Sequence, residues 1–197
     1  KSKYLPRLAA GEIGAYSLSE AGSGTDAAAM SCTAKLSDDG AHYILNGEKM
    51  WVTNGSSAGI YVLFAKDVGH QEYASRNHGG TTAFIVEKDF EGFTVGKKED
   101  KLGIRSSDTC SLILKDCKVP VENVLRGAGE GFPIAMNALD NSRIGIAAQA
   151  LGIAQGAYET ALDYAQQRTT FGKPISRHQS IGNILADLSL IHISEPT

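Results

Sequence analysis

The 197-residue sequence has little of what disulfide-bonded, metal-binding or membrane proteins need. Its cysteines, Cys32, Cys110 and Cys117, are odd in number and lack Cys-x-x-Cys spacing, which argues against a disulfide framework and a zinc site. The five histidines show no ligand-like pairing. No apolar run approaches the roughly 20 residues of a membrane span, and the first residues lack the apolar core of a signal peptide. A soluble, intracellular protein with buried thiols is therefore expected.

An excess of positive charge is missing as well. The chain has 19 Lys+Arg against 22 Asp+Glu, a net charge of -3. Without surplus cations, neither nucleic acid nor a membrane is an expected partner. The 42% hydrophobic and 21% charged fractions are ordinary for a soluble globular protein. Because Lys1 is not an initiator methionine, we interpret the chain as a fragment of a longer protein.

Short apolar runs separated by turn residues fill the chain from 11 to 125, as in an antiparallel β domain. Asp39-Gly40 and Asn46-Gly47 predict hairpins, because both central residues of a type I′ turn need positive φ. The candidate strands span 13–18, 31–36, 42–47, 49–55, 59–66, 81–88, 93–98 and 110–119.

The spacing of apolar residues becomes helical after Phe132. Pro133 suits a first helical turn, and the pattern continues to about Arg168. Such a helix would be about 54 Å long at 1.5 Å per residue. Its many alanines and glycines predict close packing against other helices, and a second amphipathic helix is expected from near His178.

The run "SLSEAGSGTDAAA" follows a strand-like segment and predicts a tight loop. Gly22 and Gly24 tolerate positive φ and leave the main chain open to a large ligand. Backbone N–H groups in such loops can hold phosphate oxygens, and the hydroxyls of Ser19, Ser23 and Thr25 add donors. A plain Gly/Ser turn is the alternative.

Two carboxylates, Glu20 and Asp26, lie in this run. By composition alone both are candidates for a general base. Structural roles are the stronger interpretation, with Asp26 capping the turn through its own backbone.

Three stretches together resemble the acyl-CoA dehydrogenase family: "YSLSEAGSGTDA", "MWVTNG" and "LDNSRIGIAAQALGIAQ…RTTFGKP…HQ". The resemblance covers roughly residues 4–188 and is closest to short-chain and short branched-chain members. It implies an α+β fold, truncated at both ends, with an antiparallel, barrel-like middle β domain over 1–125. The first long helices of a C-terminal helical bundle follow over 126–188. Residues 189–197, "SLIHISEPT" from Ser189 on, do not resemble the family and are expected to be non-native, with Pro196 breaking the helix.

The resemblance implies FAD as cofactor. Tyr16, Leu18 and Ser19 would meet the isoalloxazine ring, where a backbone N–H and a hydroxyl can stabilise incoming charge. Gly24 would lie in the same cofactor loop. Thr25 would bond to the pyrophosphate and approach the thioester substrate.

The second motif contains the single tryptophan, Trp51. A core aromatic is the competing interpretation, because large aromatic residues usually serve packing. The resemblance places the Trp51 ring against the flavin, with Val52 in backbone contact and Thr53 near N5.

Polar residues interrupt the long helix at Asp140 and Arg143, three apart and so on one face. A solvated helix face is the plain interpretation, whereas the resemblance implies contacts with coenzyme A, which a guanidinium suits. The resemblance also implies contacts with the FAD of a neighbouring subunit, made by Arg168, Phe171 and Gln179. It therefore implies a homo-oligomer, either a dimer or a tetramer.

The implied reaction is dehydrogenation of an acyl-CoA to the trans-2-enoyl-CoA, with electrons passed to an electron-transfer flavoprotein. Some members carry the catalytic glutamate where this chain has Ser142, which cannot act as a carboxylate base. The base is therefore expected outside this chain, which alone should not turn over. An acyl-CoA oxidase and a non-catalytic β-barrel binding module are the alternatives. The compartment would be cytoplasmic in a bacterium and the mitochondrial matrix in a eukaryote.

Overall fold

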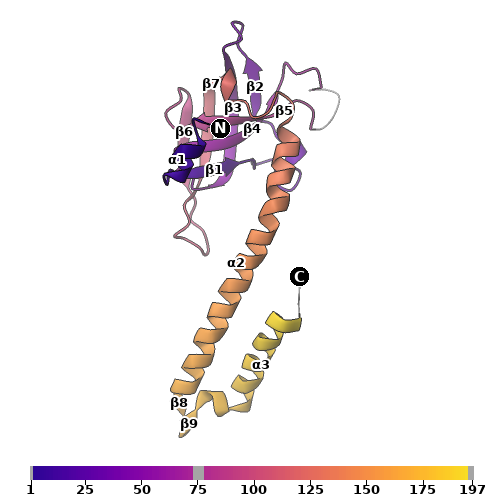
Figure 1. Ribbon diagram of the computed structural model, residues 1–197. Coiled ribbons are helices and arrows are strands. Elements are labelled where there is room, and N and C mark those ends of the chain that lie inside the picture. The colour runs from indigo at the N-terminus through magenta and orange to yellow at the C-terminus, as the bar shows by residue number, and fades with distance from the viewer. Residues whose placement is uncertain (1, 73–77, 195–197) are drawn as a thin grey trace. The chain divides into compact units, whose positions relative to one another are not determined.

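The computed structural model describes residues 2–72 and 78–194 (Figure 1). The chain divides into two units, Lys1–Asn137 and Ala138–Thr197, and each is described by itself. The first is built on strands and the second on helices, as the change in apolar spacing predicts.

Seven strands of the first unit form one sheet, in the order β1-β4-β2-β3-β7-β6 with β5 paired to β4. Most pairs are antiparallel, but β1 and β2 both run parallel to β4. The strands are β1 (Gly14–Ser17), β2 (Thr33–Leu36), β3 (His42–Thr53), β4 (Ile60–Asp67), β5 (Thr81–Glu87), β6 (Phe93–Lys98) and β7 (Thr109–Pro120). Short helical segments are α1 (Leu5–Ala9), η1 (Ala27–Ala29) and η2 (Val121–Asn123).

The core of this unit lies between the faces of the curled sheet. Leu45, Leu63, Phe84 and Leu112 are fully buried there, and the Phe84 ring packs edge-on to Tyr43 at a centroid distance of 5.1 Å. All three cysteines are buried and free, as expected. Burial of these apolar side chains is the main favourable contribution to folding of this unit.

The hairpin predicted at Asp39-Gly40 is present. Leu36 of β2 pairs with Tyr43 of β3 in antiparallel register, and the Gly40 N–H donates to the Ser37 carbonyl at 2.9 Å. Only Gly40 of this turn has positive φ, so the turn is not of type I′.

The hairpin predicted at Asn46-Gly47 is wrong, because β3 runs straight through both residues. The irregularity there is a bulge in the partner strand β7. The Asn46 side chain bonds to Asp116 at 2.8 and 3.1 Å. Glycine is required for another reason: a Cβ on Gly47 would come within 2.9 Å of the Cys32 Cα, and φ is +142°.

The long helix α2 spans Gly131–Gln167, close to the predicted 133–168, and its first turns belong to the β unit. In the helical unit it is followed by a small hairpin, β8 (Thr169–Thr170) and β9 (Lys173–Pro174), then η3 (Ile175–Arg177) and α3 (Gln179–Ser194). The helix expected from near His178 is thus confirmed. The predicted break at Pro196 lies outside the described residues.

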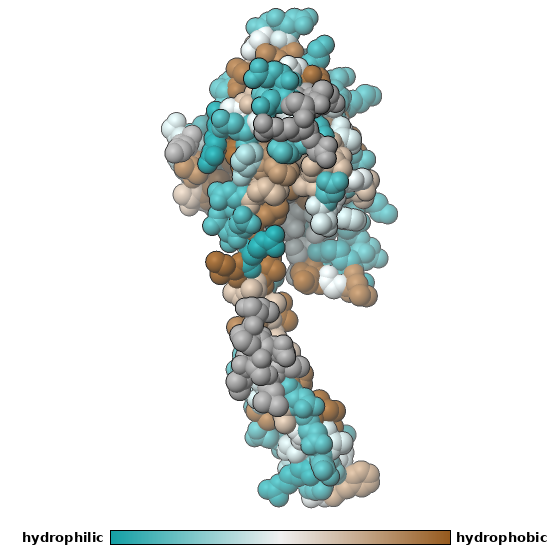
Figure 2. Space-filling model, turned by 90° about the vertical axis from the view of Figure 1, so that its right-hand side faces the viewer, coloured by the Kyte–Doolittle hydropathy of each residue, from teal (hydrophilic) through white to brown (hydrophobic). Residues whose placement is uncertain are grey.

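The helical unit exposes many aliphatic side chains. Ile144 is 78% exposed and Ile153 60%, and Ala165 alone is buried between residues 138 and 189. On the face drawn in Figure 2, brown hydrophobic residues stand among teal hydrophilic ones at several places on this unit. Within residues 2–72 and 78–194, no helix is both long and apolar enough to cross a membrane.

Candidate functional site

The loop after β1 closes on itself through backbone hydrogen bonds. The Glu20 N–H donates to the Ser23 carbonyl at 2.9 Å, and the Ser23 N–H donates to the Glu20 carbonyl at 3.1 Å. The Ser23 hydroxyl donates to the Asp26 carbonyl at 2.9 Å. Neither Gly22 nor Gly24 has positive φ, so the turn does not use that freedom. A Cβ at either glycine would meet no atom within 4 Å. The two glycines therefore leave the loop backbone open to close approach.

The two acidic residues of this loop differ in their surroundings. Glu20 is 4% exposed, and its carboxylate accepts from the Ser31 N–H, the Ser31 hydroxyl and the Cys32 N–H at 2.6 to 3.2 Å. Its structural role is confirmed. Asp26 is exposed and its side chain makes no capping hydrogen bond. Its backbone carbonyl closes the turn by accepting from the Ser23 hydroxyl and the Ala29 N–H, in agreement with the predicted backbone cap.

A buried lysine lies against Glu20. Lys49 of β3 is fully buried, and its Nζ donates to Glu20 Oε1 at 2.7 Å and to the Leu18 carbonyl at 3.0 Å. Burial alone would raise the pKa of the Glu20 carboxyl, but the adjacent ammonium and the Ser31 donors hold that pKa below its ordinary value. Glu20 and Lys49 form an ion pair in the interior.

The second motif contains a bulge at Trp51. Lys49 pairs with Leu112 and Val52 with Cys110, so β3 carries one residue more than β7 at this point. Trp51 adopts φ of +55°, a left-handed conformation that costs a non-glycine residue about 1 to 2 kcal/mol. The bulge aims the indole outward, 59% exposed, while Val52 stays buried. Trp51 is therefore not a core aromatic residue.

The structure brings the two motifs together. The Met50 N–H donates to the Ser19 carbonyl at 2.9 Å, beside the bond from Lys49 to the Leu18 carbonyl. Ser19 is half-buried, and its N–H has no acceptor among the described residues. Trp51, one residue further on, is exposed. The exposed indole thus lies next in the chain to the residue that is bonded to Ser19, whose hydroxyl and unpaired N–H we take with it as the candidate surface.

Other predicted residues lie around this surface. Tyr16 is partly exposed, and its hydroxyl donates to the Ala135 carbonyl at 3.4 Å, while burial raises the Tyr16 pKa to about 12. Leu18 is buried, whereas Thr25 and Thr53 are exposed. These side chains offer apolar area and hydroxyl groups, and no carboxylate or imidazole.

Sequence reasoning missed the residue that holds the turn after Thr53. The Asp108 carboxylate accepts from the Ser56 N–H at 2.8 Å and the Ser57 N–H at 3.2 Å, and its carbonyl accepts from Asn54 at 2.8 Å. Hydrogen bonds from Ser56 and the Lys98 charge keep the pKa of Asp108 low, against the effect of burial. No local pattern marks Asp108, because its partners are about 50 residues away.

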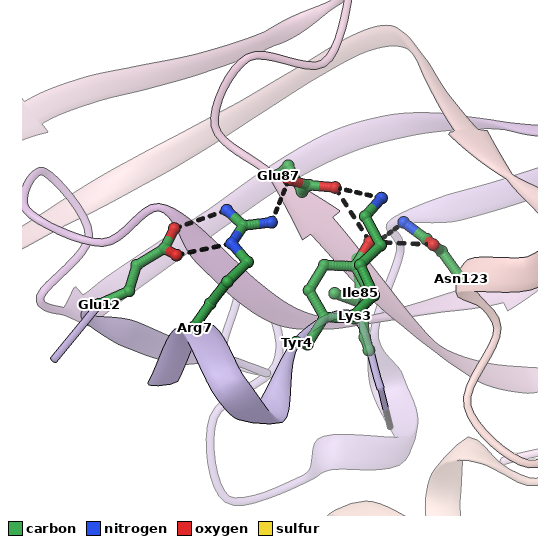
Figure 3. Close-up of polar contacts among 7 residues, drawn as sticks. All are labelled: Lys3, Tyr4, Arg7, Glu12, Ile85, Glu87 and Asn123. Atoms are coloured by element: carbon green, nitrogen blue, oxygen red, sulfur yellow. Dashed lines mark hydrogen bonds and ion pairs between the residues drawn. The ribbon is translucent and has the colours of Figure 1, made fainter. Parts of the chain in front are cut away.

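Sequence reasoning also missed a polar network that attaches α1 to the sheet (Figure 3). Arg7 donates two hydrogen bonds to Glu12 and one to Glu87, each at 2.6 Å. The Tyr4 hydroxyl lies 3.0 Å from both Glu87 and Asn123. This network joins the N-terminal helix to the end of β5.

The predicted residues of the helical unit are on its surface. Asp140 and Arg143 lie 3.7 Å apart, both at least 75% exposed, and the Ser142 hydroxyl donates to the Leu139 carbonyl at 2.9 Å. No element of the described chain holds the Asp140–Arg143 pair beyond its own helix.

The remaining predicted residues gather near the hairpin β8–β9. Phe171 is at its tip, 96% exposed with φ of +50°, followed by Gly172 at +74°. Arg168 and Gln179 are exposed as well. Among the described residues, no cluster of His, Cys, Asp or Glu could hold a metal ion.

Comparisons with known proteins agree with this geometry. The family model "Acyl-CoA dehydrogenase, middle domain" matches residues 15–117, and "Acyl-CoA dehydrogenase, C-terminal domain" matches residues 129–192. The chain is 48% identical to the short-chain specific acyl-CoA dehydrogenase of Clostridium acetobutylicum, over 96% of this chain and 48% of that protein.

Solved structures are similar in fold. Butyryl-CoA dehydrogenase of Megasphaera elsdenii aligns with a TM-score of 0.90 at 47% identity, over 98% of this chain and 49% of the other. An acyl-CoA dehydrogenase of Bacillus anthracis complexed with FAD aligns at 0.89 and 41% identity, over 96% and 32%. The chain thus spans about half the length of the relatives it matches. This chain belongs to the acyl-CoA dehydrogenase family.

Proposed function

We propose that the protein carrying this sequence oxidises a short-chain acyl-CoA to the trans-2-enoyl-CoA, with FAD as cofactor. The observation that supports this most is the hydrogen bonding of Leu18 and Ser19 to Lys49 and Met50, which joins the first motif to the start of the second. The FAD complex of the Bacillus anthracis relative supports the cofactor. The butyryl-CoA dehydrogenase of Megasphaera elsdenii supports a short acyl chain.

The residues of this surface fit a flat, aromatic, hydrogen-bonding cofactor. Trp51 exposes an indole on strained backbone, and such strain at a surface position indicates a function that requires it. The Ser19 N–H is available as a donor. The open space at Gly22 and Gly24 admits a ligand close to the main chain.

The reaction removes the α hydrogen of the thioester as a proton and the β hydrogen with its electron pair as a hydride. FAD, when bound, supplies the hydride acceptor. We assign to the Ser19 N–H and hydroxyl the stabilisation of developing negative charge. Trp51 would stack on the cofactor, Val52 and Thr53 would meet its reactive edge, and Thr25 would bind the pyrophosphate.

We assign the proton abstraction to no residue of this chain. Ser142 occupies the position where some family members carry glutamate, and its hydroxyl is bonded to Leu139. We therefore expect this chain by itself to show no turnover. Asp140 and Arg143 would contact coenzyme A.

We propose a homo-oligomer, because Arg168, Phe171 and Gln179 would contact the FAD of a neighbouring subunit. Their exposure leaves them free for such a contact. An electron-transfer flavoprotein would take up the electrons.

The test is the flavin absorbance spectrum of the purified full-length protein, before and after butyryl-CoA is added without oxygen. We expect bleaching of the oxidised flavin band. The variant Leu36→Ala, a partly exposed side chain on β2, is a matched control and should bleach as fully. Oxygen consumption after reduction would indicate an acyl-CoA oxidase instead. A folded protein without flavin would overturn the proposal.

A further inference from the structure

The ion pair of Glu20 and Lys49 is unusually deep for two charged side chains. Lys49 is fully buried and Glu20 4% exposed. Removing two charges from water costs several kcal/mol per ion, and a pair of apolar residues often stabilises a fold as well. A contribution to stability therefore explains the presence of this ion pair poorly. Its position next to the loop after β1 and the bulge at Trp51 suggests that it serves the candidate site.

Lys49 contacts one atom of the loop besides Glu20. Its Nζ donates to the Leu18 carbonyl oxygen at 3.0 Å. The peptide bond from Leu18 to Ser19 is trans, so its C=O and N–H point in opposite directions. Because the carbonyl faces the buried ammonium, the Ser19 N–H faces away from it. The hydrogen bond from Lys49 thus determines which side of the loop presents the donor.

Glu20 holds Lys49 in this position. Its carboxylate accepts three hydrogen bonds from the backbone and hydroxyl of Ser31 and the backbone of Cys32, and Oε1 also accepts from Lys49. The next peptide is fixed as well, because the Ser19 carbonyl accepts from Met50 at 2.9 Å. The carbonyls of Leu18 and Ser19 are therefore both held by residues of β3.

We infer that Lys49 is a positioning residue for the flavin: it turns the Leu18 carbonyl inward, so that the Ser19 N–H presents to the cofactor, and Glu20 fixes Lys49 in place. A cation on the carbonyl also polarises the peptide and strengthens the N–H donor at its other end. The inference rests on the proposed function, because it needs a flavin at this surface.

The main test compares Lys49→Met with wild type in the full-length protein. Methionine keeps the length of the apolar stem and removes the ammonium. Flavin affinity is measured by fluorescence quenching as flavin is added to the cofactor-free protein, and the reduction potential by equilibration with a reference dye. We expect the dissociation constant to rise on the order of tenfold, since a hydrogen bond to a charged group is lost. The potential should become more negative, because a donor to reduced flavin is weakened.

Tyr43→Phe is the matched control. It removes a buried hydrogen bond to Asp67, 3.1 Å long, in the same unit and on the same strand β3 as Lys49. Its stability should fall, while flavin affinity and potential stay at the wild-type values. A general effect of lower stability would instead move both variants together and would overturn the inference.

If Lys49→Met does not fold, the double variant with Glu20→Gln removes the unpaired buried carboxylate and is measured in the same way. If that variant also fails, exchange of the Ser19 amide hydrogen in wild type decides. Protection of this amide on adding flavin supports the inference, and unchanged exchange overturns it. A folded variant with wild-type affinity and potential overturns it as well. A wild-type protein that binds no flavin overturns the proposed function itself.

Discussion

The β unit and the helical unit treat their candidate site residues in opposite ways. In the β unit, Ser19 and Trp51 lie on backbone that is held by a buried lysine, a buried glutamate and a strand bulge. In the helical unit, Arg143 and Phe171 are 78% and 96% exposed, on elements with a single buried residue between 138 and 189. A site residue can be positioned by contacts within its own unit or by contacts with another unit or subunit. The β unit holds its candidate residues through its own contacts, whereas the helical unit leaves Arg143 and Phe171 exposed.

The largest expected difference between the units is in core stability. Phe84 is fully buried against Tyr43, so Phe84→Ala should lower the free energy of unfolding by about 3 to 5 kcal/mol. Ile144 is 78% exposed on α2, so Ile144→Ala should change it by less than about 0.5 kcal/mol, since alanine also favours helix. Urea unfolding followed by circular dichroism measures both. Similar losses in the two variants would contradict the comparison.

Acid should lower the stability by weakening the attachment of α1 to the sheet, and this effect should be smaller than that of Phe84→Ala. Burial would raise the pKa of Glu87, but hydrogen bonds from Lys3, Arg7 and Tyr4 lower it to about 2. The pKa of Glu87 is lower in the folded than in the unfolded protein. The stabilisation of the fold by ionised Glu87 is therefore fully present above about pH 4.5 and is lost as the pH falls toward 2. Because its partners Lys3 and Arg7 are partly exposed, we expect no more than about 2 kcal/mol.

Unfolding by urea at a series of pH values tests this prediction. Glu87→Gln should flatten the pH dependence between 4.5 and 2. Glu91→Gln removes an exposed ion pair with Lys118 and is the control, for which the slope should not change. A slope that persists in Glu87→Gln would assign the acid sensitivity to another carboxylate.

The smallest effect on stability is expected at Trp51. Glycine relieves the left-handed strain but loses more entropy on folding, so Trp51→Gly should leave the free energy of unfolding within about 1 kcal/mol of wild type. Trp51→Ala keeps the strain and is the matched control, expected to be less stable than Trp51→Gly by roughly 1 kcal/mol. Both variants should bind flavin more weakly. Urea unfolding and flavin titration would reveal a packing role if both variants lost several kcal/mol.

Local sequence signals predicted most elements of both units. Alternation located the strands, and the change of spacing located α2 to within two residues at each end. The prediction at Asn46-Gly47 failed because glycine there serves a close approach by Cys32, which lies directly before β2. That reason is not local, and the same holds for the parallel pairing of β1 with β4.

The candidate site was predictable only through its family resemblance. Composition alone left open whether the loop around Gly22 binds a ligand, and it favoured a structural role for Glu20 without naming the partner of its carboxylate. The partner that decides, Lys49, is 29 residues away and reads as one more strand residue. Asp140 and Phe171 are exposed in their own unit, and only the family resemblance predicts ligand contacts for them.

The bulge in β3 also has an evolutionary consequence. Lys49 and Val52 both face inward on either side of it, and the partner strand spans the same step with one residue fewer. Trp51 is in effect an added residue, whose removal would restore regular alternation without exchanging inner and outer faces. The identity of the exposed residue at this bulge can therefore diverge among descendants while the interior of the sheet stays unchanged.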